Sequence, residues 1–247
     1  LYPENALWRF DSSENKLVSE NGLYELVLQK EDGNLVLYET KTKKPLFATC
    51  TNSANSKIDV AKFQGDGNFV LYEEEVKNSR WSSNTQHTGA VKLRLENTGA
   101  IVLYDKNDKI INVINRGKWM SVLDNSLTLK QTCMPGSHDA GMYESKILAA
   151  RGIALTQNKN IFDQLIEGIR YFDLRPRFIN DKGYYVFHGG ADGPKLDDIL
   201  KDVKNFILNN PSEVVILNFS HYKDFENKND DFINYLISYF DTLLRLQ

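Results

Sequence analysis

The chain has 247 residues, of which 41% are hydrophobic and 26% are charged, a composition typical of globular proteins and far from that of disordered ones. Thirty Lys and Arg residues against 33 Asp and Glu residues give a net charge of −3, so the overall charge gives no case for nucleic acid as a partner. The sequence shows no apolar stretch long enough to span a membrane and does not open with a signal-peptide pattern. We therefore expect neither a membrane-spanning helix nor a signal peptide in it. This length fits one large domain or two smaller ones.

Two cysteines, Cys50 and Cys133, are too few for a disulfide scaffold. Free thiols are common in protein interiors because cysteine behaves as a small apolar residue. We therefore expect both cysteines to be free and buried.

A threefold repeat occupies the first half of the chain. Tyr38, Tyr72 and Tyr104 are 34 and 32 residues apart, and each ends a run of alternating apolar residues that begins at a turn signal. Each run is followed by a second short strand pattern, at residues 46–49, 80–83 and 110–113. Short strands at regular intervals, with no helical period, predict an all-β domain over residues 1–116 with pseudo-threefold symmetry, built as a prism of three small sheets.

Five residues at every second position of the second repeat form a strip on one face of a strand: Gln64, Asp66, Asn68, Val70 and Tyr72. Two amides, a carboxylate and a phenol offer hydrogen-bond donors and acceptors beside an apolar floor. This combination suits a sugar, whose hydroxyls need both and whose C–H face packs on apolar or aromatic groups. The alternative is a strand face that points to solvent and binds nothing.

The pattern Q-x-D-x-N-x-V-x-Y resembles the mannose-binding signature of bulb-type (monocot) lectins, and residues 1 to about 115 resemble one such domain. The resemblance implies a β-prism with one mannose pocket per repeat, in which Gln, Asp and Asn bind hydroxyls and Tyr completes the contact. The third repeat keeps only Val102 and Tyr104. The first repeat has Lys30 where the glutamine belongs and keeps Asp32, Asn34, Val36 and Tyr38. We expect one good, one doubtful and one inactive site, with useful avidity only from several copies or chains.

From about Lys118 the sequence changes to apolar strands that alternate with helices. The expected strands are residues 127–134, 168–174, 183–187 and 214–219, and the expected helices are residues 161–167, 196–208 and 231–246. Such alternation predicts βα units and a parallel sheet, open or closed into a barrel, over residues 117–247. The fold class expected for the whole chain is therefore all-β followed by α/β.

Ionisable residues follow three of these expected strands. His138 lies in the run Pro135 to Gly141, Asp173 and Arg175 alternate at the end of the second strand, and His188 follows the third. Active sites of parallel α/β folds lie at the carboxyl ends of their strands. Two imidazoles, a carboxylate and a guanidinium are what phosphodiester cleavage by an internal hydroxyl requires: a base, an acid and a charge on the phosphate oxygens. Each residue taken alone fits a capping or structural ion-pair role equally well.

Residues 118–222 resemble the catalytic X region of phosphatidylinositol-specific phospholipase C, through residues 119–121, 135–139, 164–175, 187–189 and 213–219. The resemblance implies a TIM-type β/α barrel in which His138 is the general base on the inositol 2-hydroxyl. It also implies that His188 is the general acid to the diacylglycerol oxygen, linked through Asp139 to Arg175, with a 1,2-cyclic phosphate as first product. The implied partner is an inositol phospholipid or a glycosylphosphatidylinositol anchor at a membrane surface.

The same arginine argues against a metal ion. Calcium-dependent members of this family surround the equivalent point with carboxylate and amide oxygens, whereas Arg175 places a fixed positive charge there. We expect cleavage without metal or other cofactor, like that of the secreted bacterial enzymes, and an extracellular location. Of the remaining histidines, His221 follows the fourth expected strand near the same face, with a substrate role as the minor alternative, and His87 is expected in a solvent-exposed loop.

Residues 117–247 are short for a barrel of this type, which takes about 250 residues and eight βα units. The four expected strands make about half a barrel, and the resemblance implies that the carboxylate orienting the general base in this family is absent. We therefore expect an incomplete barrel, either part of a longer chain or completed by a partner or a second copy. The alternatives are a carbohydrate-binding protein with a degenerate barrel, and a phosphodiesterase acting on another head group.

Overall fold

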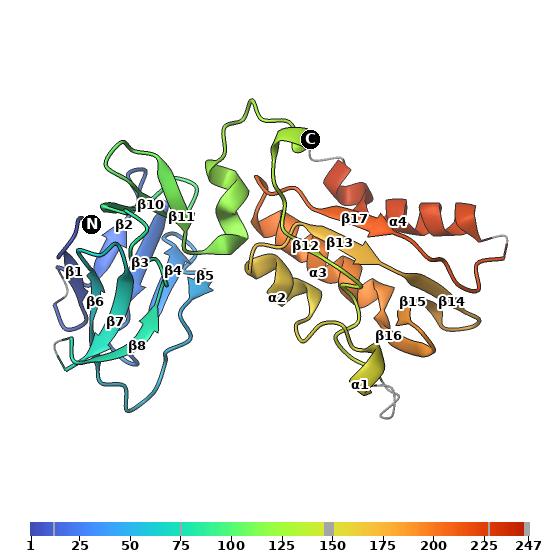
Figure 1. The fold of residues 1–247 in the computed structure, drawn as a ribbon, viewed down its shortest axis with the longest axis horizontal. Coiled ribbons are helices and arrows are strands. Elements are labelled where there is room, and N and C mark those ends of the chain that lie inside the picture. Colours follow the sequence, from blue (N-terminus) through green and yellow to red (C-terminus); the bar gives the residue numbers. More distant parts are fainter. Residues whose placement is uncertain (12, 75, 146–150, 227, 245–247) are drawn as a thin grey trace. The chain divides into compact units, whose positions relative to one another are not determined.

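The computed structural model describes residues 1–247 except 12, 75, 146–150, 227 and 245–247. The chain divides into two units, Leu1–Asn115 and Arg116–Gln247 (Figure 1). Within the described residues, no helix combines the length and the apolar character needed to cross a membrane.

Three antiparallel sheets make up the first unit. One contains, in spatial order, β1 (Ala6–Trp8), β6 (Ile58–Phe63), β7 (Phe69–Glu73) and β8 (Asn78–Ser82). The next contains β2 (Lys16–Val18), β3 (Tyr24–Leu28), β4 (Leu35–Glu39) and β5 (Pro45–Ala48). The third contains β11 (Ile110–Val113), β10 (Ile101–Tyr104) and β9 (Lys92–Leu95). This unit is therefore all-β, with one sheet for each sequence repeat.

Alternation along the strands sends one set of side chains inward and the other outward. The inward set forms one apolar core and includes Leu26, Leu37, Phe63, Phe69, Leu71, Leu93 and Leu103. Val36, Val70 and Val102 face the other way, outside this cluster, yet they are at most 3% exposed. The outer face of each repeat therefore has a buried apolar floor beneath its polar residues.

A parallel sheet of three short strands lies at the centre of the second unit. Its order is β12 (Gly136–Ser137), β13 (Tyr171–Leu174) and β17 (Ile216–Phe219). Asp173 of β13 pairs in register with Asn218 of β17, and Ser137 pairs with Phe172. The carboxyl ends of the three strands therefore lie side by side at one edge of the sheet.

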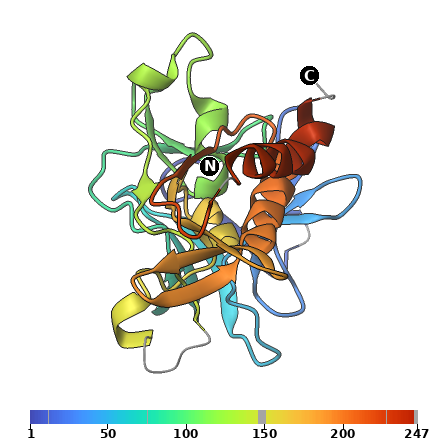
Figure 2. The same cartoon turned by 90° about the vertical axis from the view of Figure 1, so that its right-hand side faces the viewer.

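The helices of this unit are α1 (Arg151–Ala154), α2 (Ile161–Ile166), α3 (Leu196–Asn209) and α4 (Asn229–Leu244). The last three were expected from the sequence, although the end of the expected 231–246 helix lies outside the described residues. Figure 2 shows α3 in orange and α4 in dark red as two separate helices. They are joined by hydrogen bonds from Lys204 Nζ to Tyr239 O and from Tyr239 Oη to Asp197 O, at 2.9 and 2.8 Å.

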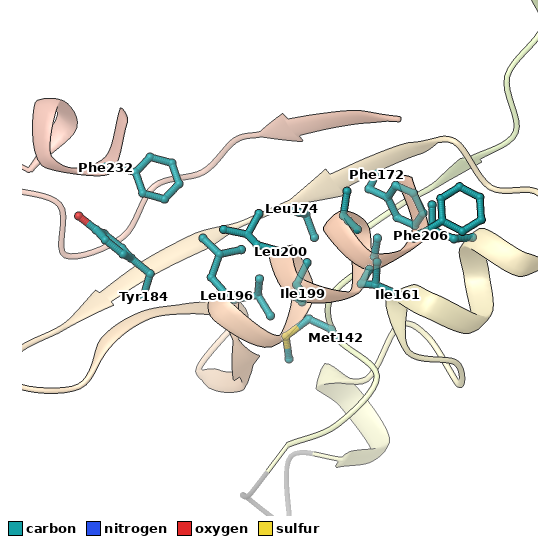
Figure 3. Packing of buried hydrophobic residues seen from close by; sticks show 14 of the residues in the cluster. Met142, Ile161, Phe172, Leu174, Tyr184, Leu196, Ile199, Leu200, Phe206 and Phe232 are labelled. Atoms are coloured by element: carbon teal, nitrogen blue, oxygen red, sulfur yellow. The ribbon is translucent and has the colours of Figure 1, made fainter. Parts of the chain in front are cut away.

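Helix α3 buries one face against the sheet. Leu196, Ile199, Leu200, Val203 and Phe206 fall on a single helical stripe and are at most 1% exposed. They pack in one cluster with Phe172 and Leu174 of β13 (Figure 3). This packing fixes the strand that carries Asp173.

The strand expected at 183–187 is present as β15 (Gly183–His188), but it is not part of the parallel sheet. It lies between β14 (Pro176–Ile179) and β16 (Ala191–Lys195) in an antiparallel sheet. Neither neighbour was predicted from the sequence; Ala191–Lys195 contains Gly and Pro and shows no strand period. His188 therefore reaches the site from an antiparallel strand and not from a barrel strand as expected.

The strand expected at 127–134 is wrong. The segment contains a 3₁₀ turn, Leu129–Gln131, and the parallel strand β12 begins only at Gly136. Leu127 and Leu129, which suggested a buried strand, are 41% and 53% exposed. Gln131 instead accepts hydrogen bonds from the backbone and side chain of Thr128, which stabilises a turn in place of a strand.

Cys50 and Cys133 are free, as expected, but both are exposed, so the expectation of buried thiols is wrong. Cys50 has a φ of 56°, which places it in a left-handed turn and not in an inward-facing strand position. His87 is exposed, as expected.

A buried ion pair connects the start of the second unit to its sheet. Arg170 and Glu213 are 0% and 4% exposed, and Glu213 Oε2 accepts hydrogen bonds from Arg170 Nε and Nη2 at 3.0 and 2.7 Å. The remaining Arg170 N–H groups donate to the carbonyls of Gly117, Leu165 and Ile169. Every N–H of this guanidinium is thus used, which is what a charge buried this deeply requires.

Candidate active site and glycan-binding strips

Asp139 is buried among three basic side chains. Its Oδ1 lies 2.5 Å from Arg175 Nε, and its Oδ2 lies 3.3 Å from His138 Nε2 and 3.5 Å from His188 Nε2. Only 2% of the residue is exposed. Asp139 has a φ of 46°, a conformation that non-glycine residues seldom adopt and that clusters at functional sites. The two histidines and the arginine named by the sequence analysis therefore converge on one carboxylate.

Asp173 contacts the other side of the His138 ring. Its Oδ2 lies 2.9 Å from His138 Nδ1, and its Oδ1 accepts hydrogen bonds from Ser220 Oγ at 3.0 Å and from Asn218 Nδ2 at 3.4 Å. Burial alone would raise the pKa of Asp173, but the Ser220 hydroxyl, the backbone N–H of Asp139 and the nearby basic groups lower it below the usual aspartate value. Asp173 is therefore held in its ionised form beside His138.

Four buried polar atoms at this site have no hydrogen-bond partner among the described residues. They are Ser137 Oγ, Asp139 Oδ1, Arg175 Nε and His188 Nδ1. The Arg175–Asp139 contact is thus an ion pair without hydrogen-bond geometry. Each unsatisfied buried group costs about 1–3 kcal/mol, and such groups are rare enough in native proteins to need an explanation. Asp139 Oδ1 and Arg175 Nε are paired with each other, so Ser137 Oγ and His188 Nδ1 are the two atoms of this group that have no partner among the described residues.

An open pocket of about 550 Å³ gives access to this cluster. It is lined by residues from the ends of all three parallel strands: Gly136, Ser137, His138, Tyr171, Asp173, Asn218, Ser220 and His221. The side chain of His138 is 72% exposed, so a ligand in the pocket can reach its ring. Arg175 and His188 contact Asp139 and are not among the residues that line this pocket.

The sequence analysis missed Asn218 and Ser220 and set His221 aside. His221 Nδ1 lies 3.0 Å from Ser220 Oγ, so a chain of contacts runs from His221 through Ser220 and Asp173 to His138. The sequence contains a pattern that could have identified them. Asn218 and Ser220 are two residues apart at the end of β17, as Asp173 and Arg175 are at the end of β13. The two pairs lie at the same edge of a parallel sheet.

His138, Asp139 and Asp173 each offer one ligand atom within 4.8 Å of the others. These three residues are the part of the described chain that could hold a divalent cation. Arg175 lies against Asp139, however, and its fixed charge would repel a cation there. The donor set fits a metal ion poorly.

The strip of the second repeat is organised by internal hydrogen bonds. Gln64 Nε2 donates to Tyr72 Oη at 2.8 Å, and Asp66 Oδ1 accepts from the backbone N–H of Asn68 at 2.9 Å. Asn68 Oδ1 accepts from Ser82, Ser83 and Thr85. These contacts use the oxygen of the Asn68 amide, so that its N–H₂ remains as the donor.

The first repeat has the same arrangement, and the expectation that Lys30 takes the glutamine's place is wrong. Gln29 Nε2 donates to Tyr38 Oη at 2.7 Å, as Gln64 does to Tyr72. The backbone N–H of Gln29 bonds to Asn34 O, whereas that of Gln64 bonds to Asn68 O, so this hairpin loop is one residue longer. The extra residue shifts the glutamine out of the alternating pattern. Asp32 and Asn34 make the same contacts as Asp66 and Asn68. Asp32 Oδ1 accepts a hydrogen bond from the backbone N–H of Asn34, and Asn34 Oδ1 accepts from the Thr49 hydroxyl and the Thr51 backbone N–H.

The third repeat has a different arrangement. Glu96 takes the glutamine's place and its Oε1 accepts a hydrogen bond from Tyr104 Oη at 2.6 Å. Burial, together with this carboxylate, raises the pKa of Tyr104 well above its usual value. Ala100 stands where Asn is found in the other two repeats and is fully buried. The amide donor of the strip is therefore missing.

No family model matches the chain. A 1-phosphatidylinositol phosphodiesterase from Listeria monocytogenes is 31% identical over 136 residues, which is 54% of this chain and 41% of that protein. A solved structure of the phosphatidylinositol-specific phospholipase C of Staphylococcus aureus matches 44% of this chain and 37% of its own, at 32% identity and a TM-score of 0.41. Structures of monomeric monocot mannose-binding lectins from Gastrodia elata match 46% of this chain and 93% of theirs, at 29% identity and a TM-score of 0.38.

The chain spans less than half the length of the curated relatives it matches. It is similar, over part of its length, to phosphatidylinositol-specific phospholipases C and to proteins named for their X domain. Its matches among solved structures include both a phospholipase C of this kind and mannose-binding lectins.

Proposed function

We propose that the second unit is a phosphodiesterase of the phosphatidylinositol-specific phospholipase C type. The observation that carries the proposal is the convergence of His138, His188 and Arg175 on the buried carboxylate of Asp139. Relatives at about 30% identity that are named as such enzymes support it. The proposed substrate is an inositol phospholipid or a glycosylphosphatidylinositol-type lipid at a membrane surface.

In the proposed reaction the neighbouring inositol hydroxyl attacks phosphorus. His138 takes the proton of this hydroxyl, and Asp173 contacts its ring at Nδ1. The bond between phosphorus and the glycerol oxygen breaks, and His188 donates a proton to that oxygen. Arg175 stabilises the charge that builds on the non-bridging phosphate oxygens. The products are diacylglycerol and inositol 1,2-cyclic phosphate, and the step needs no metal ion or other cofactor.

Asp139 and Asp173 act through the groups they contact. Asp173 keeps the His138 ring in one orientation, as the carboxylate of a catalytic triad orients its histidine. Asp139 holds His188 and Arg175 close to each other, because both contact its carboxylate. In this proposal Asp173 supplies the orienting carboxylate for which the sequence analysis found no residue.

We propose further that the outer strips of the first two repeats bind a mannose-type glycan. The support is the repeated hydrogen-bond pattern in which Gln29 meets Tyr38 and Gln64 meets Tyr72. Each strip offers an amide donor, a carboxylate acceptor and a phenol above a buried valine, which matches the needs of a hexose. Single pockets of this kind are weak, so two strips on one chain increase avidity for a glycan-covered surface.

Together, the two proposals describe an extracellular enzyme that is held at a glycosylated surface while it cleaves lipid there. The test is release of water-soluble inositol phosphate from phosphatidylinositol vesicles by the full chain. His138→Ala and His188→Ala should each lower the rate by about 10²–10⁴. His87→Ala is the matched control because His87 is an exposed histidine of the first unit, and it should leave the rate unchanged.

A carbohydrate-binding protein without catalytic activity is the second candidate. The observation that favours it is the pair of fully organised strips in the first unit. On that reading the vesicles release no inositol phosphate, whereas mannose binding by the same preparation persists. If the chain cleaves a glycerophosphodiester or a sphingolipid faster than phosphatidylinositol, its substrate has another head group.

A further inference from the structure

A groove of about 530 Å³ runs along the outer face of β1 and β6, next to the strip of the second repeat. Its lining includes Glu4, Ala6, Trp8, Lys16, Val60 and Lys62. Trp8 is 41% exposed, so the groove presents a large aromatic ring to solvent. Val60, in contrast, is fully buried and forms part of the floor.

The strand register places this groove beside the sugar strip. Trp8 pairs with Val60 across β1 and β6, and Val60 pairs with Tyr72 across β6 and β7. Side chains that lie directly opposite in an antiparallel pair share one face of the sheet. Trp8, Val60 and Tyr72 therefore form a row, with Trp8 two strand spacings from Tyr72, about 10 Å. A disaccharide bridges this distance.

The polar groups of the groove continue those of the strip. Glu4 Oε2 pairs with Lys62 Nζ at 2.6 Å, while Glu4 Oε1 accepts the backbone N–H of Gly65 at 3.0 Å. Gly65 belongs to the turn that carries Gln64 and Asp66. The groove thus combines a carboxylate and an ammonium group with an aromatic ring, the combination that binds sugars by stacking and by hydroxyl hydrogen bonds.

The first repeat lacks this extension, although its strip is complete. The equivalent row across β2, β3 and β4 is Val18, Glu25 and Tyr38. Val18 replaces the tryptophan, and Glu25 is a buried carboxylate that pairs with Lys16 and Lys43. The third sheet has three strands, β9 to β11, and so has no strand in the position of β1.

We propose that the groove is a second sugar subsite, so that the second repeat binds an oligosaccharide of at least two hexoses while the first binds one. The first hexose occupies the strip at Asn68 and Tyr72, and the next stacks on Trp8. This inference rests on the proposed glycan binding of the strips. It makes the second repeat the one that selects between glycans.

The test compares mannose and mannotriose by titration calorimetry, using the full chain with Tyr38→Ala to silence the first strip. We expect mannotriose to bind about tenfold more tightly than mannose, which corresponds to the stacking of one aromatic ring. Trp8→Ala should remove this preference and leave mannose affinity unchanged, and Trp8→Phe should retain part of it. Phe10→Ala is the matched control, because Phe10 is 65% exposed two residues along the chain and does not line the groove.

The outcomes separate the subsite from the strip. Equal affinity for the two sugars in the parent protein, or a preference that survives Trp8→Ala, overturns the subsite and leaves the strip standing. Binding of neither sugar by the unsubstituted chain overturns both proposals. If Trp8→Ala unfolds the protein, as followed by circular dichroism, Trp8→Phe decides: retention of the whole preference or loss of mannose affinity in that variant contradicts the subsite.

Discussion

His138 Nδ1 lies 2.9 Å from Asp173 Oδ2, on the neighbouring strand of the parallel sheet. Nε2 of the same ring lies 3.3 Å from Asp139 Oδ2, so carboxylates contact both ring nitrogens. Ser220 and Asn218, from the third strand, fix the other oxygen of Asp173. Residues at the ends of all three parallel strands therefore position the His138 ring: Asp173 contacts it, and Asn218 and Ser220 hold Asp173.

Ser220→Ala is expected to raise the pKa of Asp173, because the Ser220 hydroxyl donates to the ionised carboxylate. A carboxyl whose pKa is lowered by folding contributes stability above its unfolded pKa of about 3.9 and loses it as the pH falls through the folded value. The variant should thus be less stable by about 1 kcal/mol near pH 7, a small effect because solvent screens the site. The difference should shrink as the pH falls through the folded pKa of Asp173.

Urea unfolding at a series of pH values measures this effect. Ser238→Ala is the control, because Ser238 donates its hydroxyl to a backbone carbonyl of an exposed helix turn and not to a carboxylate. A destabilisation by Ser220→Ala that is the same at pH 2 and pH 7 would show that the hydroxyl does not act through the ionised form of Asp173.

Gln29→Ala is expected to weaken mannose binding by the first strip, because Gln29 bonds to Tyr38 as Gln64 does to Tyr72. Loss of one hydrogen-bonding partner predicts about a tenfold lower affinity. Lys30→Ala, one residue away, should have no effect. Calorimetry in a Tyr72→Ala background isolates the first strip. The opposite ranking of the two variants would restore Lys30 as the residue of the pattern.

Glu213→Ala is expected to destabilise the second unit by about 3–5 kcal/mol, because it leaves the fully buried guanidinium of Arg170 without its counter-charge. It also removes the acceptor of the Met120 and Ser121 backbone N–H groups. Glu167→Ala breaks the exposed pair with Lys159 and should cost less than about 1 kcal/mol. Equal effects of the two substitutions in denaturant unfolding would contradict a structural role for the buried pair.

Chelation of divalent cations is expected to leave lipid cleavage unchanged, since Arg175 occupies the position beside Asp139 that a cation would need. The measurement is the rate of cleavage before and after dialysis against EDTA. A loss of activity that calcium restores would assign His138, Asp139 and Asp173 to a metal ion.

The sequence predicted which residues lie together at the candidate site, because strand ends are local features. His138 follows a Pro-Gly turn signal, and Asp173 and Arg175 alternate near a strand end, so their placement needs only the strand period and a parallel sheet. Asn218 and Ser220 follow the same rule, but their role depends on the register between β13 and β17. Register is set by pairing between distant segments, which the sequence of one segment does not contain.

The errors have physical causes of the same kind. Gln29 was missed because one added loop residue breaks an alternating pattern without disturbing the hairpin that presents it. The prediction of a strand at 127–134 was wrong because it took the apolar Leu127 and Leu129 to be buried, whereas both are exposed. Strand β16 was not predicted because Gly193 and Pro194 are unfavourable in strands. The segment is a strand because it pairs with β15.

The most direct test of the central claim is ³¹P NMR of phosphatidylinositol during cleavage by the full chain. If His138 and His188 catalyse attack by the inositol hydroxyl, the cyclic phosphate resonance appears first, and both His138→Ala and His188→Ala abolish it. Direct formation of inositol 1-phosphate with no cyclic phosphate, or a rate that both variants leave intact, would contradict this account.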